Sequence, residues 1–391
     1  MSASVRPSLL SGPSSRSAAT ARCRGRKYVE PAGGGPVRRS LGDTGKQAAG
    51  GRRCVLQARA GHRIRQPRYG IAVSTATLEF EEPINVLLTE IEALCLMPRT
   101  PARHQEIDAL RHRMLQVRQE IYSTLTPWQR VLVARHPKRP YTLDYIGRLF
   151  TDFTELHGDR RFGDDHAIVA GFARFDGEPI LVVGHQKGRD TKQKVYRNFG
   201  YARPEGYRKA MRAMKLAEKF DRPIIAFIDT PAAYPGVESE ERGVAEAIAY
   251  NLREMAMLSV PIVVAVIGEG GSGGALGLAV GDRILMLEYA IFGVIPPEGC
   301  AAILWRDTAR KVEAADALKV TASDLVGLGV IDEVVPEPVG GAHTDPAAAI
   351  RLLAPALSRA MQTLTTTPPD LRLQQRHDRF RQLGLVGIDG I

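Results

Sequence analysis

Residues 261–281 join an apolar run to a cluster of glycines, and this stretch constrains the fold more than any other. Ile262 to Ile267 is a short β-branched and apolar run preceded by Pro261, which predicts a strand buried on both faces. A short helix is expected from about Ala275. Between strand and helix lie five glycines: Gly268, Gly270, Gly271, Gly273 and Gly274. Such a turn brings several free N–H groups to one point, which favours a bound phosphate or an oxyanion formed during a reaction.

The same glycines fit the dinucleotide-binding pattern G-x-G-x-x-G, with Glu288 twenty residues after Gly268. However, the strand expected at residues 283–287 leaves room for only about two helical turns of ~3.6 residues. A dinucleotide fold usually needs a longer crossover helix. The short helix therefore favours an oxyanion hole, and a packing corner without chemistry is the other alternative.

Composition places the chain among globular proteins and excludes several classes. Its 391 residues suffice for one large or two modest domains, and a hydrophobic content of 44 % permits a sizeable core. No apolar run approaches the ~20 residues that span a bilayer. The four cysteines are scattered, which argues against a disulfide framework and against a zinc ribbon, and favours a reducing compartment.

The net charge of +10 comes from the N-terminal segment. Residues 1–70 contain fifteen Lys or Arg and two acids, a net charge of +13, so residues 71–391 carry −3. The body of the protein is therefore not a general polyanion binder. The segment is rich in Ser, Gly and Arg without hydrophobic periodicity, which predicts disorder. It fits either an organelle transit peptide or a leader translated from a misplaced start codon.

Composition and periodicity together predict three regions: a disordered segment at 1–70, a helical region at 77–136 and a main domain at 137–391. Helical spacing predicts helices over 83–97 and 104–122, and Thr126-Pro127 begins a third. The first two form a hairpin that is too small to fold alone and must pack on the main domain or on a partner.

Strands alternate with helices from Tyr141 onward, which predicts a mostly parallel α/β sheet covered on both faces. Asp176-Gly177 is the turn of an expected β-hairpin. The other predicted strands are 223–229, 262–267, 284–287, 291–295 and 330–335, and the predicted helices are 141–156, 207–220, 241–258, 299–305, 309–318, 321–327 and 346–364, before a basic tail.

Ligands gather at the carboxyl ends of parallel strands, where three segments should meet. One is a basic loop with Lys187, Arg189 and Lys192, which suits a carboxylate or phosphate unless it is a solvated turn. The second is the proline-rich loop 229–236, and the third is the glycine stretch. The histidines lack metal-ligand spacing, and Asp159, Asp164 and Asp165 fit an ordinary turn better than a metal site.

Ser272 offers a hydrolase alternative, because Gly270-Gly-Ser-Gly-Gly274 fits the nucleophile pattern G-x-S-x-G. Against it, the expected Asp and His do not follow in order at later strand ends, and His343 is the only late candidate.

Residues from about 77 to 391 resemble the α subunit of the bacterial and plastid-type acetyl-coenzyme A carboxylase carboxyltransferase. The resemblance rests on motifs spread over the chain: Arg135-His-Pro, His157-Gly-Asp-Arg160, Gly184-His-Gln-Lys-Gly-Arg-Asp-Thr191, Arg197-Asn-Phe-Gly200, Gly206-Tyr-Arg-Lys-Ala210, Glu269-Gly-Gly-Ser-Gly-Gly-Ala275 and Pro297-Glu-Gly-Cys300. It implies a crotonase-like (ClpP/crotonase) spiral α/β fold with an N-terminal helical hairpin. One departure is Ala232, where the family usually has Gly; it adds a methyl group beside the cleft.

The resemblance implies transfer of the carboxyl group of carboxybiotin, carried on a biotin carrier protein, to acetyl-CoA, which gives malonyl-CoA for fatty acid synthesis. The implied partners are a zinc-bearing β subunit in an α2β2 heterotetramer, the carrier protein and biotin carboxylase, with no metal in this chain. The expected location is the cytoplasm, or the plastid stroma if residues 1–70 are a transit peptide. Another crotonase-superfamily acyl-CoA enzyme and a non-catalytic scaffold are the alternatives.

Within this interpretation, N–H groups of the catalytic candidates Gly273, Gly274 and Ala275 stabilise the ureido oxyanion of biotin. The candidate substrate-binding residues are Gly270, Gly271, Lys187, Arg189 and Tyr234. The biotin enolate takes the proton of the acetyl methyl group, and the β subunit holds the thioester oxyanion. If the backbone of Gly274 lies against the ureido oxygen, Gly274→Val is expected to lower kcat and to spare the fold.

Overall fold

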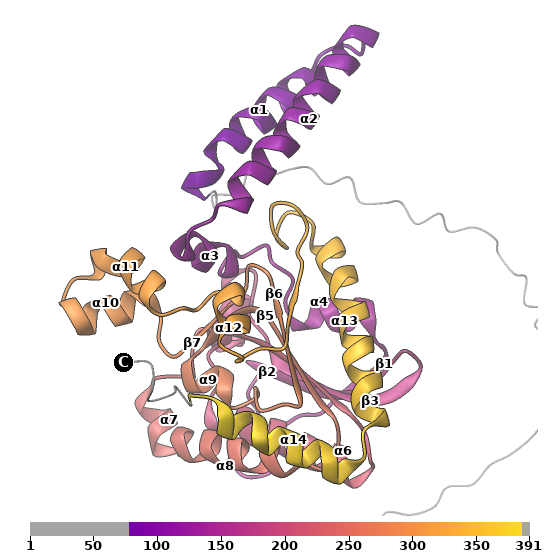
Figure 1. The fold of residues 1–391 in the computed structure, drawn as a ribbon, viewed down its shortest axis with the longest axis vertical. Helices are drawn as coiled ribbons and strands as arrows, with labels where there is room; N and C mark the ends of the chain where they lie inside the picture. Colours follow the sequence, from indigo (N-terminus) through magenta and orange to yellow (C-terminus); the bar gives the residue numbers. More distant parts are fainter. Residues whose placement is uncertain (1–77, 385–391) are drawn as a thin grey trace, which may run out of the picture. The chain divides into compact units, whose positions relative to one another are not determined.

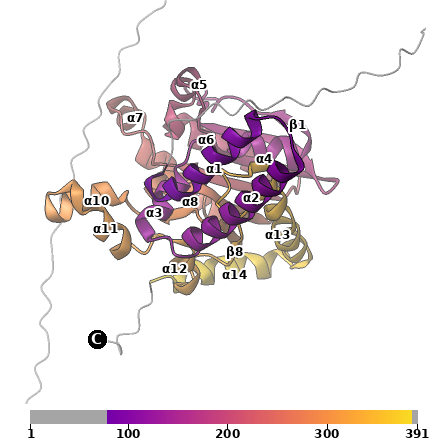
Figure 2. The same ribbon diagram turned by 90° about the horizontal axis from the view of Figure 1, so that it is seen from above.

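The computed structural model describes residues 78–384, so the expectation for residues 1–70 lies outside the described residues. Helices α1 (Glu82–Leu96) and α2 (Pro101–Ser123) follow the short 3-10 helix η1 (Glu79–Glu81) and lie side by side, as Figures 1 and 2 show. Both predicted helices are confirmed. Helix α3 (Pro127–Ala134) begins where Thr126-Pro127 predicts, with a capping box between Thr126 and Gln129.

A buried apolar cluster joins the base of the helical pair to the rest of the protein. Ile84 and Tyr122 from the helices pack with Leu125, Val133 and Tyr289. The Tyr122 hydroxyl donates a hydrogen bond to Glu81 Oε1 at 2.6 Å. The pair therefore buries part of its apolar surface against the chain that follows it, as its small size requires.

One sheet holds all the described strands, in the order β1-β2-β3-β4-β5-β6-β8, with β7 beside the end of β5. Strands β1 to β3 are antiparallel and the other pairs are parallel, which confirms the predicted α/β class. The strands are β1 (Thr151–Glu155), β2 (Ile168–Phe175), β3 (Glu178–His185), β4 (Ile224–Thr230), β5 (Ile262–Gly271), β6 (Arg283–Leu287), β7 (Ile291–Gly293) and β8 (Glu333–Val335).

The β2–β3 hairpin turns at Asp176 and Gly177, as predicted. Both residues have positive φ, 50° and 85°, which is the geometry of a type I′ turn. Its hydrogen-bonded register runs without interruption from Ile168↔His185 to Phe175↔Glu178. Since β2 begins where β3 ends, the loop before β2 lies at the carboxyl edge of the parallel strands.

Helices cover both faces of the sheet (Figure 1). Helices α6 (Pro204–Lys219) and α8 (Val244–Met257) pack together on one face, and α4 (Thr142–Leu149) and α13 (Pro346–Thr366) on the other. The core between these layers is apolar and includes all of Ile224–Ile228 and Ile262–Ile267, each at most 1 % exposed. The fully buried run predicted for the central strand is confirmed.

Two predicted helices are shorter than expected. The helix predicted for 141–156 ends at Leu149, and β1 follows it with the β-branched residues Thr151 and Thr154. The helix predicted for 241–258 begins only at Val244, as α8, because Gly243 before it has a left-handed φ of 75°. The short helix α7 (Val237–Glu241) ends before that glycine. Among residues 78–384, no helix is both long and apolar enough to cross a membrane.

The C-terminal segment predicted as a basic tail instead forms helix α14 (Pro369–Gln382). Arg376, which is 1 % exposed, pairs with Asp282 at 2.7 Å and donates to the carbonyls of Met255, Leu258 and Val260. Arginine side chains thus perform the anchoring that apolar residues usually provide.

The remaining helices are α5 (Thr191–Tyr196), η2 (Asn198–Gly200), α9 (Ser272–Leu276), α10 (Pro297–Trp305), η3 (Thr308–Arg310), α11 (Lys311–Ala317) and α12 (Ala322–Gly327).

Candidate active site

The central strand continues through the first glycines, further than the sequence predicts. β5 ends at Gly271 and α9 begins at Ser272. Gly270 pairs with Phe292 of β7, and a Cβ on Gly270 would lie 2.7 Å from the Phe292 ring. A Cβ on Gly271 would overlap the Pro231 carbonyl oxygen at 1.7 Å. These two glycines, predicted to bind substrate, therefore permit close packing of β5 between β7 and the 231–234 loop.

A bulge in β5 lies just before the glycine turn. The β4–β5 pairing passes from Ile228↔Val266 to Thr230↔Gly270, so β5 uses two more residues than β4 over this interval. Two side chains form hydrogen bonds with the backbone of the bulge. Asp229 Oδ1 accepts from the Glu269 N–H at 3.0 Å, and Arg139 donates to the Ile267 carbonyl at 2.9 Å.

Helix α9 supplies the N–H groups of the predicted oxyanion hole. The N–H groups of its first turn, including those of Gly273 and Gly274, have no partner within the helix. Ala275 occupies the fourth position, whose N–H normally bonds the carbonyl four residues earlier. Gly273 is half-buried, whereas Gly274 and Ala275 are buried. Gly273 is consequently the most accessible donor of the three.

Gly274 also seats α9 on the neighbouring loop. A Cβ there would lie 2.3 Å from the Ala233 nitrogen and 2.4 Å from the Ala232 carbonyl carbon. The Tyr207 hydroxyl donates to the Gly274 carbonyl at 3.2 Å. The sequence-based expectation that Gly274→Val spares the fold is therefore wrong, because the added side chain has no space. Ala232 itself is half-buried in the loop that faces Gly274.

An apolar cavity of about 350 Å³ opens beside the accessible end of α9. Its walls come from α9, β7 and the region around α12, and include Gly273, Leu276, Phe292, Leu325 and Leu328. This volume lies within the range of small-molecule sites, which are mostly apolar with few polar groups. A ring system in this cavity would lie next to the turn.

Charged side chains cluster behind the turn. Lys187 Nζ lies 2.8 Å from Asp229 Oδ1 and 3.2 Å from Glu269 Oε2. Arg135 bridges Glu269 and Glu298, with both nitrogen–oxygen distances at 2.6 Å. Burial alone would raise the pKa of Glu269, but Lys187 and Arg135 hold that pKa below its usual value. Burial likewise opposes the charge of Lys187, and the two carboxylates raise its pKa.

The basic side chains of the predicted loop do not form one site, because Lys187 and Arg189 have different partners. Lys187 points toward the strand ends, whereas Arg189 pairs with Asp144 of α4 and lies over the Tyr141 ring at 4.7 Å. Tyr234 is on the loop that faces α9, and its ring stacks under Arg203 at 4.5 Å. All three predicted substrate-binding side chains thus have partners within the chain. Of the three, Lys187 pairs with a residue of β5 itself, Glu269, just before the turn.

The acidic loop before β2 is an ordinary turn, as predicted. Asp159 Oδ1 accepts from the N–H groups of Arg161, Phe162 and Gly163, and Asp164 pairs with Lys209 at 2.6 Å. Burial lowers the pKa of His185 to about 3, so this histidine is neutral. Within residues 78–384, no group of three or more His, Cys, Asp or Glu side chains is arranged to hold a metal ion.

Ser272 occupies a strained position with φ 52°, between strand and helix, as a hydrolase nucleophile would. The base that this alternative requires is engaged elsewhere. His343 Nε2 lies 3.3 Å from Glu81 Oε1 and 3.4 Å from the Tyr122 hydroxyl, at the base of the helical pair. His343, the late histidine that this alternative offered as a base, is therefore committed to Glu81 and Tyr122.

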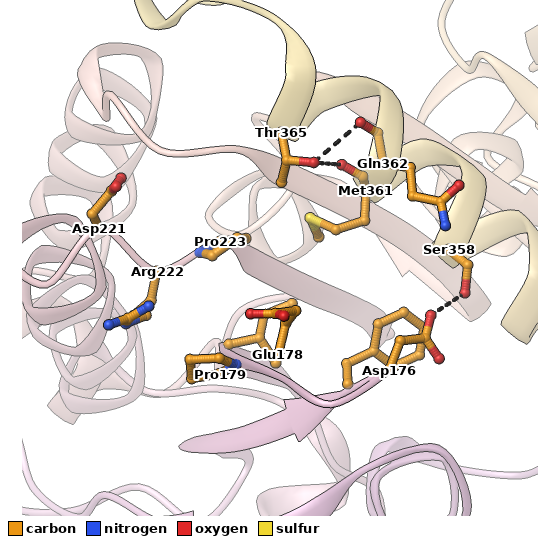
Figure 3. Close-up of a pocket in the computed structure, with 12 residues that line it drawn as sticks. Asp176, Glu178, Pro179, Asp221, Arg222, Pro223, Ser358, Met361, Gln362 and Thr365 are labelled. Carbon is orange, nitrogen blue, oxygen red and sulfur yellow. Dashed lines mark hydrogen bonds between the residues drawn. The ribbon is translucent and has the colours of Figure 1, made fainter.

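A second cavity, of about 420 Å³, lies away from these groups (Figure 3). It is lined by Pro179 at the start of β3, by Pro223 just before β4 and by Met361 of α13. These positions mark the amino ends of the parallel strands. The cavity is thus at the edge opposite the glycine turn.

Comparisons with known proteins reveal relatives along most of the chain. The profile of a family described as "Acetyl co-enzyme A carboxylase carboxyltransferase-like" matches residues 77–384. Acetyl-coenzyme A carboxylase carboxyl transferase subunit alpha of Geobacter metallireducens is 56 % identical over 307 residues, 78 % of this chain and 96 % of that protein. The same subunit of Geobacter sulfurreducens is 62 % identical over 267 residues, 68 % and 84 % of the two chains. A solved structure of transcarboxylase 12S is similar with a TM-score of 0.46 at 23 % identity, over 56 % of this chain and 41 % of that one.

Proposed function

Because the chain belongs to the family of acetyl-coenzyme A carboxylase carboxyltransferase α subunits, and is a transferase subunit, we propose that its glycine turn is the oxyanion site for carboxyl transfer to acetyl-CoA. The crotonase-like fold follows from membership of this family. One observation carries the proposal: the half-buried Gly273 lies in the first turn of helix α9, beside an apolar cavity of about 350 Å³.

Carboxybiotin fits this cavity and turn by its chemistry. Its tetrahydrothiophene ring is apolar and suits the walls around Leu276 and Phe292. When bound, it supplies the carboxyl group and then a ureido oxygen that carries negative charge. The N–H groups of Gly273 and Gly274 would donate to that oxygen, and one such donor contributes roughly 3 kcal/mol to the transition state.

The family membership makes this chain one subunit of a multisubunit enzyme. We propose that the partner that completes the site at the glycine turn is a zinc-bearing β subunit. It holds acetyl-CoA and its thioester oxyanion in an α2β2 assembly. A biotin carrier protein, charged by biotin carboxylase, would deliver the carboxyl group. The proposed setting is the cytoplasm, or the plastid stroma if residues 1–70 are a transit peptide.

Ser272→Ala separates carboxyl transfer from the hydrolase alternative. The assembled α–β enzyme carrying this substitution is expected to keep malonyl-CoA formation within about threefold of wild type, because the backbone N–H groups are unchanged. Its rate with the charged carrier protein is measured beside its thioesterase activity on acetyl-CoA. A loss of about 1,000-fold or more, as for a missing nucleophile, would overturn the oxyanion proposal.

A further inference from the structure

Lys187 is held by ion pairs between the ends of two strands, and these ion pairs indicate a role other than substrate binding. Its ammonium group contacts Asp229 at the end of β4 and Glu269 in β5, at 2.8 and 3.2 Å. The three side chains are 13 %, 4 % and 7 % exposed. Two carboxylates therefore already neutralise this cation, which leaves little charge for a substrate carboxylate or phosphate.

The path of the Lys187 side chain is shaped by a neighbouring glycine. Gly200 has φ +85°, and a Cβ there would lie 2.7 Å from Lys187 Cγ. The Gly200 carbonyl accepts a 2.7 Å hydrogen bond from Thr230, the residue after Asp229, so this loop is fixed beside β4. The aliphatic stem thus passes through a gap that only glycine leaves open.

Both carboxylates that pair with Lys187 act on the bulge of β5. Asp229 Oδ1 lies within bonding distance of both the Lys187 ammonium group and the Glu269 N–H. Glu269 lies in the bulge itself, and its other oxygen is held by Arg135. Removing Lys187 would leave two buried carboxylates without their shared cation. The backbone that follows is glycine-rich and offers little resistance to a shift.

We propose that Lys187 is a positioning residue. It holds the β5 bulge through Asp229 and Glu269, and thereby fixes the direction of the N–H groups of Gly273 and Gly274. This inference rests on the proposed function, because it concerns the same site. Misplacing donors by about 1 Å is enough to cost ~100-fold in rate. A positioning residue therefore affects kcat, whereas a substrate contact affects KM.

The first test compares Lys187→Met with Lys194→Met in the assembled α–β enzyme. Lys194 lies nearby in α5 and makes no ion pair with any residue of the described range. Lys187→Met is expected to lower kcat at least tenfold, with KM for acetyl-CoA and for the charged carrier within twofold. Lys194→Met should match wild type. A raised KM with kcat retained, or an unchanged kcat, would overturn the proposal.

A double-mutant cycle asks whether Lys187 acts through Glu269. In the Glu269→Gln background, Lys187→Met is expected to lower kcat less than threefold, because both substitutions disturb one contact. Lys187→Arg, which keeps the charge, should recover part of the rate. Independent effects that multiply, or an arginine variant no better than methionine, would contradict the assignment.

Hydrogen exchange provides a readout that does not need activity. Peptides covering residues 266–275 should exchange at least tenfold faster in Lys187→Met than in Lys194→Met, in the full-length chain. Equal protection in the two variants would refute the positioning role. If the wild-type assembly formed no malonyl-CoA, the proposed function would fail. Hydrogen exchange would still show whether Lys187 holds the β5 bulge in place.

Discussion

A chain carrying Gly274→Val should lose both stability and activity. Valine at this position must displace α9 or the 231–234 loop, since the Ala233 nitrogen is only 2.3 Å from the Cβ position. Overpacking of this kind typically costs about 1–3 kcal/mol or more in the free energy of unfolding. Because the shift moves the proposed N–H donors, malonyl-CoA formation should also fall at least 100-fold in whatever enzyme assembles.

Gly273→Ala is the matched control. A Cβ on Gly273 meets only Ile248, at 3.7 Å, which is ordinary van der Waals contact. Its unfolding midpoint should stay close to wild type, and its kcat within about threefold, because the N–H remains. Urea unfolding and turnover are measured on the same preparations. A stable and fully active Gly274→Val enzyme would show that the helix is not seated on this loop.

Arg139→Met should lower the stability of the fold even more than Gly274→Val does. Arg139 makes a bidentate ion pair with Glu337 at 2.7 and 2.8 Å, with side chains 2 % and 0 % exposed. It also satisfies the Ile267 carbonyl in the β5 bulge. The substitution leaves a buried carboxylate uncompensated, which typically costs 3–5 kcal/mol. The free energy of unfolding in urea measures this loss.

Two further variants make the Arg139 test specific. Arg189→Met removes an ion pair whose side chains are 43 % and 38 % exposed, so it should cost about 1 kcal/mol or less. Adding Glu337→Gln to Arg139→Met should restore part of the stability, because it removes the stranded charge. A loss below about 1 kcal/mol for Arg139→Met would contradict the buried-pair account.

Local chemistry explains which elements were predictable from the sequence. The Asp176-Gly177 turn and the Thr126-Pro127 cap have strong local signals, and both form where expected. Helix α14 has a weak signal, since its anchoring residues are arginines such as Arg376, which a sequence pattern predicts to be solvent-exposed. Its partners, Asp282 and the carbonyls of residues 255–260, are distant in sequence.

The candidate site was predictable in place but not in detail. A strand followed by glycines and a helix start was enough to indicate the turn. The sequence did not reveal that Gly270, Gly271 and Gly274 face neighbouring backbone or rings, because those neighbours come from residues 231–233 and 292. Likewise, Lys187 and Arg189 look alike in sequence and diverge because Asp229 and Glu269 attract one, and Asp144 the other. Asp229, at the end of a buried strand, was the available signal for this cluster.

Reconstitution of the enzyme from separate subunits shows whether this chain supplies half of a carboxyltransferase site. Malonyl-CoA formation from acetyl-CoA and carboxylated carrier protein is measured with the purified chain, with its β partner, and with both together. Each subunit alone should be inactive, and the mixture should form malonyl-CoA at least 1,000-fold faster than either. Robust malonyl-CoA formation by this chain alone, or none by the assembled mixture, would contradict it.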